Sequence, residues 1–95
     1  MTAASVFDFR FKAGDAEEGK ELAASIGRDM PSTEGYLRHD VIGDVADSAH
    51  FVVITYWAEQ SQGEAVLTGY VTDAKVSRAA ELIGAQPSGF LGRVA

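Results

Sequence analysis

One tryptophan, two histidines and three tyrosines carry most of the side-chain chemistry open to this sequence. The imidazole of His39 has an unperturbed pKa of about 6.5, close to the pH at which a general base must work. Tyr70 carries a phenol with an unperturbed pKa near 10, so we expect it to donate a hydrogen bond or orient a substrate. Trp57 offers a flat ring that can stack on an aromatic molecule and donate one hydrogen bond. We predict that Tyr70, His39 and Trp57 are catalytic residues.

A second set of residues could bind a substrate. Asp8 and Arg10 are two residues apart in an alternating segment, so an extended strand places both side chains on one face. If that face lines a cavity, Arg10 can bind an oxyanion and Asp8 can accept a proton. With Tyr56, they form the substrate-binding set that we predict. The same charges can instead form ion pairs with each other or with Arg38 and Asp40.

The catalytic candidates also have structural explanations. Trp57 can pack in the core or at a dimer contact, and Tyr70 can close an edge of the sheet. A lone histidine with apolar neighbours, such as His39, can be a satisfied structural residue. His50 opens its predicted strand beside a turn, and we expect it to be exposed.

The composition argues against several other kinds of site and partner. The sequence has no cysteine, which removes disulfides, thiolate catalysis and cysteine zinc sites. The two histidines lack carboxylates at ligand spacing, and the glycines form no phosphate-binding run, so we expect no metal, no nucleotide and no other cofactor. The serines lie in caps and loops without a nucleophile elbow. A formal net charge of −6 predicts neither nucleic acid nor an anionic membrane as a partner.

The length and composition fit one domain over residues 1–95. The chain has 95 residues, of which 46% are hydrophobic, as is usual for a single globular domain. The opening MTAASVFDFRFK lacks a basic segment followed by a continuous apolar run. No stretch approaches the roughly 20 apolar residues of a membrane span. We therefore expect a cytoplasmic protein.

The elements that must position the candidate residues follow from periodicity. Alternation predicts strands over residues 6–11, 36–42 and 50–57 and a short strand in the closing GFLGRVA. Apolar residues at four-residue spacing predict a helix that Asp15 caps and Pro31 ends. Capping signals at Ser61 and Asp73 predict two further helices, the second stopped by Gly84.

This order of elements is typical of an α+β, ferredoxin-like βαββαβ plait with a four-stranded antiparallel sheet. Strand 50–57 is largely apolar on both faces, so we expect it to be central and covered on both sides. Helices cover only one face of such a sheet. A second copy is the simplest cover for the other, which predicts a homodimer. In strand 36–42, alternation predicts that Tyr36 and His39 lie on opposite faces.

Three stretches, EGYLRHDVIGD, HFVVITYW and AEQSQGEA, resemble the antibiotic biosynthesis monooxygenase family. The resemblance covers most of the chain and implies a dimeric α/β barrel, in which two sheets pack face to face. The family includes small oxygenases that oxidise aromatic polyketides to quinones without metal or flavin. By resemblance, we predict a cofactor-independent monooxygenase that oxidises a small aromatic phenol or anthrone to a quinone.

The sequence departs from the family pattern at two places. Members often carry a histidine in the helix after the tryptophan, near residues 67–69 of this chain, where it is missing. The Asn and His of the haem-degrading branch fall near Phe7 and near Val66 and Val76, which argues against haem breakdown. Two alternatives remain open: a non-catalytic dimeric module that binds a small hydrophobic ligand, and an oxygen-independent isomerase or cyclase in which His39 shuttles a proton.

Overall fold

The computed structural model describes residues 2–70 and 72–95. Its elements run in the order strand, helix, strand, strand, two helices and strand, which confirms the predicted ferredoxin-like arrangement. Short 3-10 turns precede and follow the first helix, at Ala13–Asp15 and Met30–Ser32. The strands and helices are β1 (Ala3–Arg10), α1 (Ala16–Asp29), β2 (Tyr36–Asp44), β3 (Asp47–Trp57), α2 (Gln60–Tyr70), α3 (Ala74–Ile83) and β4 (Ser88–Arg93).

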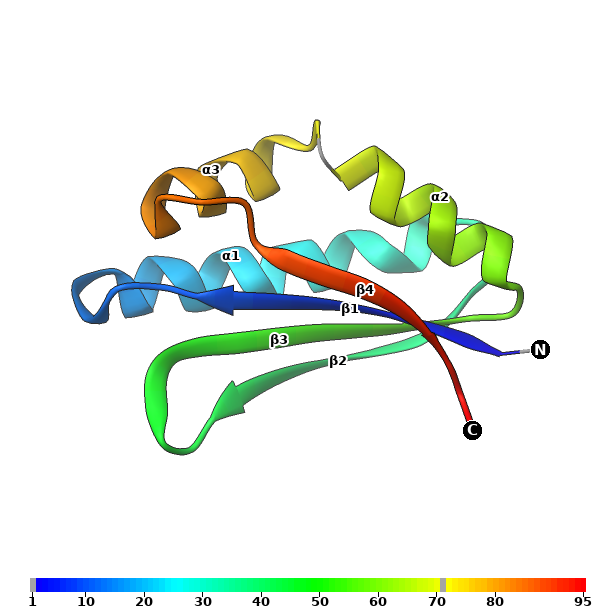
Figure 1. The fold of residues 1–95 in the computed structure, drawn as a ribbon, viewed down its shortest axis with the longest axis horizontal. Coiled ribbons are helices and arrows are strands. Elements are labelled where there is room, and N and C mark those ends of the chain that lie inside the picture. The colour runs from blue at the N-terminus through cyan, green and yellow to red at the C-terminus, as the bar shows by residue number, and fades with distance from the viewer. Residues whose placement is uncertain (1, 71) are drawn as a thin grey trace.

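The four strands form one antiparallel sheet in the order β2-β3-β1-β4. β3 is therefore an interior strand, as the sequence predicts for residues 50–57. The three helices lie together on one face of the sheet, and β4 runs along its edge below α2 and α3 (Figure 1). This arrangement leaves β2 and β4 as the two edge strands, with β3 and β1 between them.

The core lies between the sheet and the helices. β1 contributes Phe7 and Phe9 to it, Phe11 follows directly after that strand, and β3 contributes Val53 and Trp57. Burial of each such large apolar side chain stabilises the fold by about 1.5–3 kcal/mol. The helices complete the core with small and medium side chains, among them Ala23, Ile26, Val66, Val76 and Ala79.

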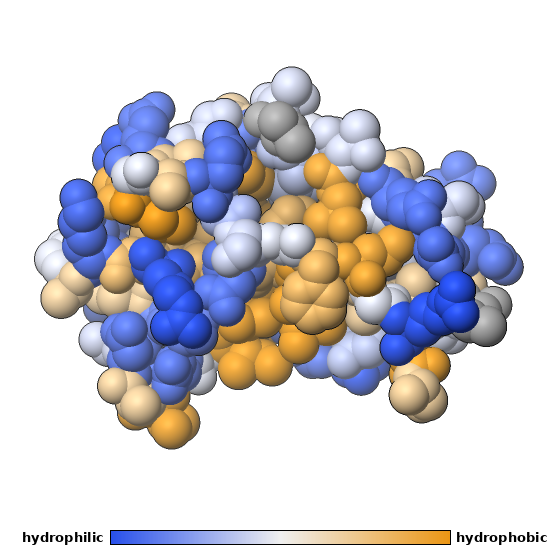
Figure 2. Space-filling view, in the orientation of Figure 1, coloured by the Kyte–Doolittle hydropathy of each residue, from blue (hydrophilic) through white to orange (hydrophobic). Residues whose placement is uncertain are grey.

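The other face of the sheet carries no helix in the described part of the chain, and we call it the open face. Phe90 and Ile42 on this face are 61% and 48% exposed. Figure 2 shows apolar side chains gathered in the middle of the molecule, with hydrophilic ones toward both ends. From the strand registers, the open-face residues are Ala4, Val6, Asp8 and Arg10 of β1, Arg38, Asp40 and Ile42 of β2, His50, Val52, Ile54 and Tyr56 of β3, and Ser88, Phe90 and Gly92 of β4.

The predicted capping signals have different outcomes. The Asp73 side chain accepts hydrogen bonds from the backbone N–H groups at the start of α3, and Gly84 ends that helix with φ 84°, so both predictions are confirmed. Asp15 directly precedes α1, but its side chain makes no capping hydrogen bond. The prediction for Ser61 is wrong, because α2 begins at Gln60. Instead, the side-chain oxygen of Gln62, inside α2, accepts a hydrogen bond from the backbone N–H of Glu59 at 2.9 Å. This bond satisfies the donor that directly precedes the helix.

The pairing of β2 with β3 is irregular at its start. The register shifts between Tyr36 and Arg38, so that β2 has one residue more than its partner there. The extra residue moves Tyr36 to the helix side of the sheet, where its hydroxyl lies 2.7 Å from Nδ1 of His39. The prediction that Tyr36 and His39 face opposite ways is therefore wrong. Leu37, at the irregularity, is 53% exposed.

Candidate functional site

A cavity of about 370 Å³ lies between the helices α2 and α3 and the β1–β4 side of the sheet. We call it the α2–α3 cleft. Its size falls within the roughly 300–1,000 Å³ range of small-molecule pockets. Among the residues that the structure describes, the lining consists of Phe7, Leu67, Tyr70, Val76, Gln86, Pro87 and Gly89, of which only Tyr70 and Gln86 have polar side chains. The cleft therefore suits a small molecule that is mostly apolar.

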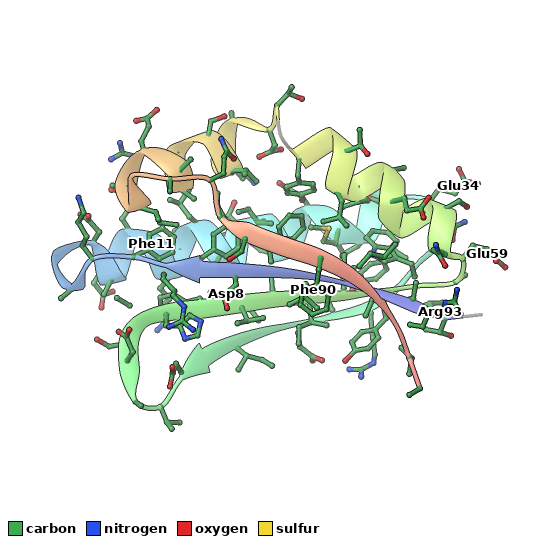
Figure 3. The ribbon with its side chains drawn as sticks, viewed as in Figure 1. Asp8, Phe11, Glu34, Glu59, Phe90 and Arg93 are labelled. Carbon is green, nitrogen blue, oxygen red and sulfur yellow. The ribbon has the colours of Figure 1, made fainter. Side chains whose placement is uncertain are left out.

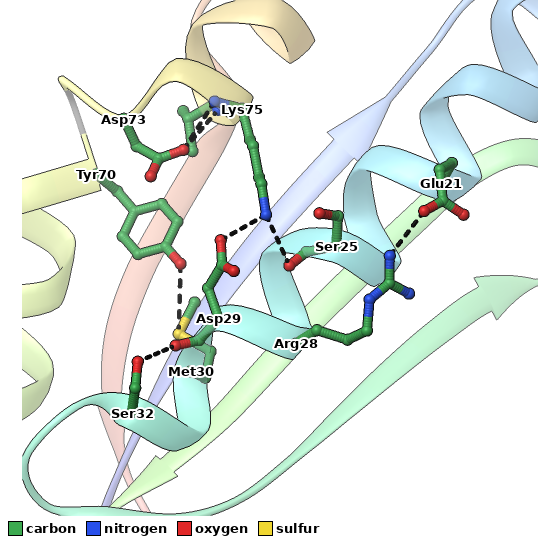
Figure 4. Close-up of polar contacts among 10 residues, drawn as sticks. Glu21, Ser25, Arg28, Asp29, Met30, Ser32, Tyr70, Asp73 and Lys75 are labelled. Carbon is green, nitrogen blue, oxygen red and sulfur yellow. Dashed lines mark hydrogen bonds and ion pairs between the residues drawn. The ribbon is translucent and has the colours of Figure 1, made fainter.

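Tyr70 stands at the end of α2, where it joins the cleft to the core. Its ring lies 5.1 Å from that of Phe7, tilted by 39°. Its hydroxyl donates to the Met30 sulfur at 3.6 Å (Figure 4). Burial raises the pKa of the Tyr70 phenol well above its ordinary value, and the negative charges of Asp73 and Asp29 add to the effect. Tyr70 therefore stays protonated at neutral pH and acts as a hydrogen-bond donor, not as a base.

The charges near Tyr70 are paired with one another. Nζ of Lys75 on α3 lies 2.8 Å from an Asp29 carboxylate oxygen and 3.4 Å from the Ser25 carbonyl oxygen on α1 (Figure 4). The Asp73 carboxylate accepts the first N–H groups of α3. These contacts join α3 to α1 and hold one wall of the cleft in place. The lining residues themselves carry no charge.

Trp57 lies in the core, outside the lining of the cleft. It is fully buried, and its indole N–H donates to Oγ of Ser5 at 3.0 Å. Its ring meets that of Tyr36 edge-on, with centres 6.4 Å apart. The single donor of Trp57 is thus already used inside the protein, and the structure brings this residue to Tyr36 rather than to Tyr70.

His39 lies on β2, on the helix side of the sheet. Its Nδ1 pairs with the Tyr36 hydroxyl, and its ring packs on α1 at Gly27, where an added Cβ would come within 3.0 Å of it. β2 and β4 are opposite edges of the sheet. Two strands therefore separate His39 from the β4 wall of the cleft, and the structure does not bring His39 and Tyr70 together.

The three predicted substrate-binding residues all lie on the open face, on the side of the sheet away from the cleft. Figure 3 shows Asp8 and Phe90 on this side and Phe11 turned toward α1. Nε of Arg10 lies 3.5 Å from an Asp8 oxygen. The two residues thus form the ion pair that the sequence analysis gave as the alternative to substrate binding. Tyr56 lies under the Arg38 guanidinium, whose carbon is 4.1 Å from the ring centre. Arg38 also pairs with Asp40 at 3.0 Å.

His50 is a buried residue, so the prediction that it is exposed is wrong. Its Nδ1 lies 2.9 Å from an Asp44 oxygen, and its Nε2 lies 3.0 Å from an Asp8 oxygen. The hydrogen bond to Asp44 raises the pKa of His50 most, and the hydrogen bond to Asp8 raises it further. Burial acts in the opposite direction, but the pKa stays above its usual value. Asp8 is far from His50 in the sequence, and strand pairing brings the two together. No local spacing could have indicated this contact.

Sequence reasoning also missed Gln86, the second polar residue of the cleft. It belongs to the α3–β4 connection, where no periodicity shows which way a side chain points. Across residues 2–70 and 72–95, no group of three His, Asp or Glu side chains is placed to hold a metal ion. Among the same residues, no helix combines the length and the apolar character needed to cross a membrane.

Comparison with known proteins places this chain in a family. Residues 3–69 match the family described as antibiotic biosynthesis monooxygenase. The chain belongs to this family. The matched part runs from the start of β1 to Gly69 in the last turn of α2, so it includes Phe7 and Leu67 and stops just before Tyr70. No curated protein sequence matches the chain.

Several solved structures have the same fold as this member of the antibiotic biosynthesis monooxygenase family, although their sequence identity to it is low. A conserved protein from Methanosarcina mazei is 12% identical with a TM-score of 0.73, over 100% of this chain and 94% of that one. SnoaB from Streptomyces nogalater, a cofactor-independent oxygenase solved as a mutant, is 16% identical with a TM-score of 0.65, over 96% and 88%. At these identities the likeness establishes the fold alone.

Proposed function

We propose that this chain is a cofactor-independent oxygenase that binds a small aromatic phenol or anthrone in the α2–α3 cleft and oxidises it to a quinone. The observation that carries the proposal is an apolar cleft with one half-buried phenol donor, Tyr70, in a member of a monooxygenase family. The Phe7 ring and the aliphatic walls favour a flat apolar ligand. SnoaB, a cofactor-independent oxygenase of the same fold, supports this choice of chemistry.

In the proposed reaction, the substrate supplies all the electrons. The CH2 carbon of an anthrone first loses a proton, and the negative charge collects on the carbonyl oxygen across the ring. O2 then takes four electrons from that carbon in total: one oxygen atom becomes the new carbonyl and the other leaves as water. The Tyr70 hydroxyl donates a hydrogen bond to the charged oxygen and so stabilises the intermediate anion.

Among the described residues, the lining of the cleft offers no side-chain acceptor for the proton. The lining residues that the structure describes include neither a carboxylate nor an imidazole, and Tyr70 stays protonated. In this proposal the proton passes to water at the mouth of the cleft, so an acidic substrate is required. A phenol or anthrone whose anion is spread over several rings meets that requirement, whereas a simple hydrocarbon does not.

Oxygen consumption tests the proposal. Purified chain is mixed with a panel of anthrones and hydroquinones, and dissolved O2 and quinone are recorded beside a protein-free control. We expect O2 uptake above the spontaneous rate, with equal amounts of O2 consumed and quinone formed from an anthrone. Spontaneous rates across the whole panel would reject the oxygenase.

The missing base favours a second candidate, a module that binds a small aromatic molecule without changing it. The same cleft supports binding even if no proton is removed. Calorimetric titration with anthraquinone, which cannot be oxidised further at this carbon, measures binding alone. Binding without O2 uptake from any anthrone supports this candidate, and absence of both rejects the cleft as a site.

We further propose that two copies associate through their open faces. A sheet covered on one side only leaves apolar residues such as Phe90 and Ile42 in water, and a second copy buries them. Sedimentation of Phe90→Asp and Ile42→Asp tests this. Both variants should be monomers, whereas Val45→Asp, at a fully exposed residue of the β2–β3 turn, should leave the dimer intact. Monomeric wild-type protein at every concentration would reject the dimer.

A further inference from the structure

The Asp8–His50–Asp44 cluster ties together three strands at one end of the open face. His50 belongs to β3, Asp8 to β1 and Asp44 to the end of β2. Arg10, directly across from His50 in the strand pairing, lies 3.5 Å from the same Asp8 carboxylate. The His50 side chain is only 11% exposed, and those of Asp8 and Asp44 are about one-third exposed. The cluster is thus half enclosed by the protein before any partner covers it.

Both ring nitrogens of His50 face carboxylate oxygens, and an ionised carboxylate can only accept a hydrogen bond. A neutral imidazole carries one N–H and so can satisfy only one of the two carboxylates. An imidazolium carries two and satisfies both. The geometry therefore fits the protonated form of His50.

The charges of the cluster balance only when His50 is protonated. Asp8 and Asp44 carry two negative charges, while Arg10 and an imidazolium carry two positive charges. Loss of the His50 proton leaves one negative charge uncompensated. Asp47, which pairs with Asp44 across the β2–β3 hairpin and accepts the Ala49 N–H, adds a further negative charge outside these four groups, so loss of the His50 proton raises the excess negative charge of this region from one to two.

We propose that this cluster makes the association of two open faces depend on pH, with the dimer favoured when His50 is protonated. The inference rests on the proposed dimer and not on the proposed oxygenase. A second sheet removes water from the cluster, and burying an uncompensated charge costs more than burying a balanced set. Each dimer contains two such clusters by symmetry. The partner that covers the open face is thus a second copy of the chain. It binds more tightly at lower pH.

Sedimentation at pH 6 and pH 9, at constant ionic strength, tests the proposal. Carboxylates stay ionised and lysines stay protonated over this range, so the titrating side chains are the two histidines. We expect the dissociation constant of the wild-type dimer to rise between pH 6 and pH 9 by on the order of a hundredfold for each unit by which association raises the pKa of His50, because each dimer carries two such residues and each contributes about tenfold. His50→Gln, which cannot take up a proton, should lose this dependence. Circular dichroism at both pH values shows that each sample remains folded.

The outcomes separate this inference from the proposals on which it depends. A dimer with the same dissociation constant at both pH values, or a His50→Gln dimer with the wild-type pH dependence, overturns the role of the cluster alone. A monomer at every pH overturns the dimer as well. Oxygen uptake by the cleft is measured independently of all these results.

Discussion

The Tyr70 hydroxyl donates its hydrogen bond to the Met30 sulfur over 3.6 Å. A thioether is a weak acceptor, so an oxygen atom of a bound molecule can replace it at little cost. This contact links the end of α2 to Met30, directly after α1.

Tyr70→Phe should weaken binding of an aromatic carbonyl compound without harming the fold. The variant keeps the ring contact with Phe7 and loses only the hydroxyl. We expect anthraquinone to bind about 1 kcal/mol less tightly, the net value of one hydrogen bond. The free energy of unfolding in urea should change by less than about 1 kcal/mol, since the lost partner is a thioether. Unchanged affinity in calorimetry would show that Tyr70 does not contact the ligand.

Thr55→Val should be neutral or stabilising. Oγ1 of Thr55 is buried and has no hydrogen-bond partner among the described residues, and an unpaired buried hydroxyl costs roughly 1–3 kcal/mol. The neighbouring Ser5→Ala is the matched contrast, because it removes the acceptor of the Trp57 N–H. It should destabilise by about 1–3 kcal/mol. Urea unfolding of both variants checks the pair, and the opposite order would contradict it.

Gly63→Ala and Gly69→Ala add the same methyl group to α2 with opposite expected results. At Gly63 the new Cβ would lie 2.6 Å from Leu91 and 3.0 Å from Trp57, and such overpacking costs typically 1–3 kcal/mol. At Gly69 no atom of the described residues lies within 4 Å of the new Cβ, apart from its chain neighbours and the backbone of α2 itself. Alanine there should stabilise the helix by up to about 1 kcal/mol. Equal thermal unfolding temperatures for the two variants would show that α2 does not pack as described.

His50 should titrate above its ordinary pKa of about 6.5 in an NMR experiment on the imidazole. The raised pKa means that the protonated ring stabilises the fold fully below about pH 6.5, and that this contribution is lost as pH rises through the folded-state pKa. The hydrogen bond between His50 and Asp44 also lowers the pKa of Asp44. The contribution of ionised Asp44 to stability is therefore lost as the pH falls through its folded-state pKa. Asp44→Asn should move the His50 pKa back down. A His50 pKa at or below 6.5 in the wild type would contradict the cluster.

Periodicity predicted the fold because it reports on burial, and burial decides which face of each element packs. The alternation around Phe9 and the apolar run ending at Trp57 correctly placed β1 and β3. The faces at the start of β2 were mispredicted, because a register shift of one residue turned Tyr36 over, and no alternation pattern shows such a shift.

The candidate site was predictable only in part. Tyr70 was chosen for its phenol and its place near the missing family histidine, and it lines the cleft. His39 was chosen by its pKa, yet the strand order puts it near the far edge of the sheet. The His50 contacts and the position of Gln86 depend on strand pairing and on a loop, which local sequence does not specify. Tertiary contacts of this kind cannot be predicted from the residue types and their local spacing.

Filling the cleft tests the central claim most directly. Leu67→Trp places a large ring in the lining of the cleft, while Leu37→Trp makes the same change at an exposed residue of β2. Oxygen uptake with an anthrone is measured for the wild type and for both folded variants. We predict uptake above the spontaneous rate in the wild type and Leu37→Trp, and a fall to the spontaneous rate in Leu67→Trp. Full activity in Leu67→Trp would show that the reaction does not take place in the α2–α3 cleft.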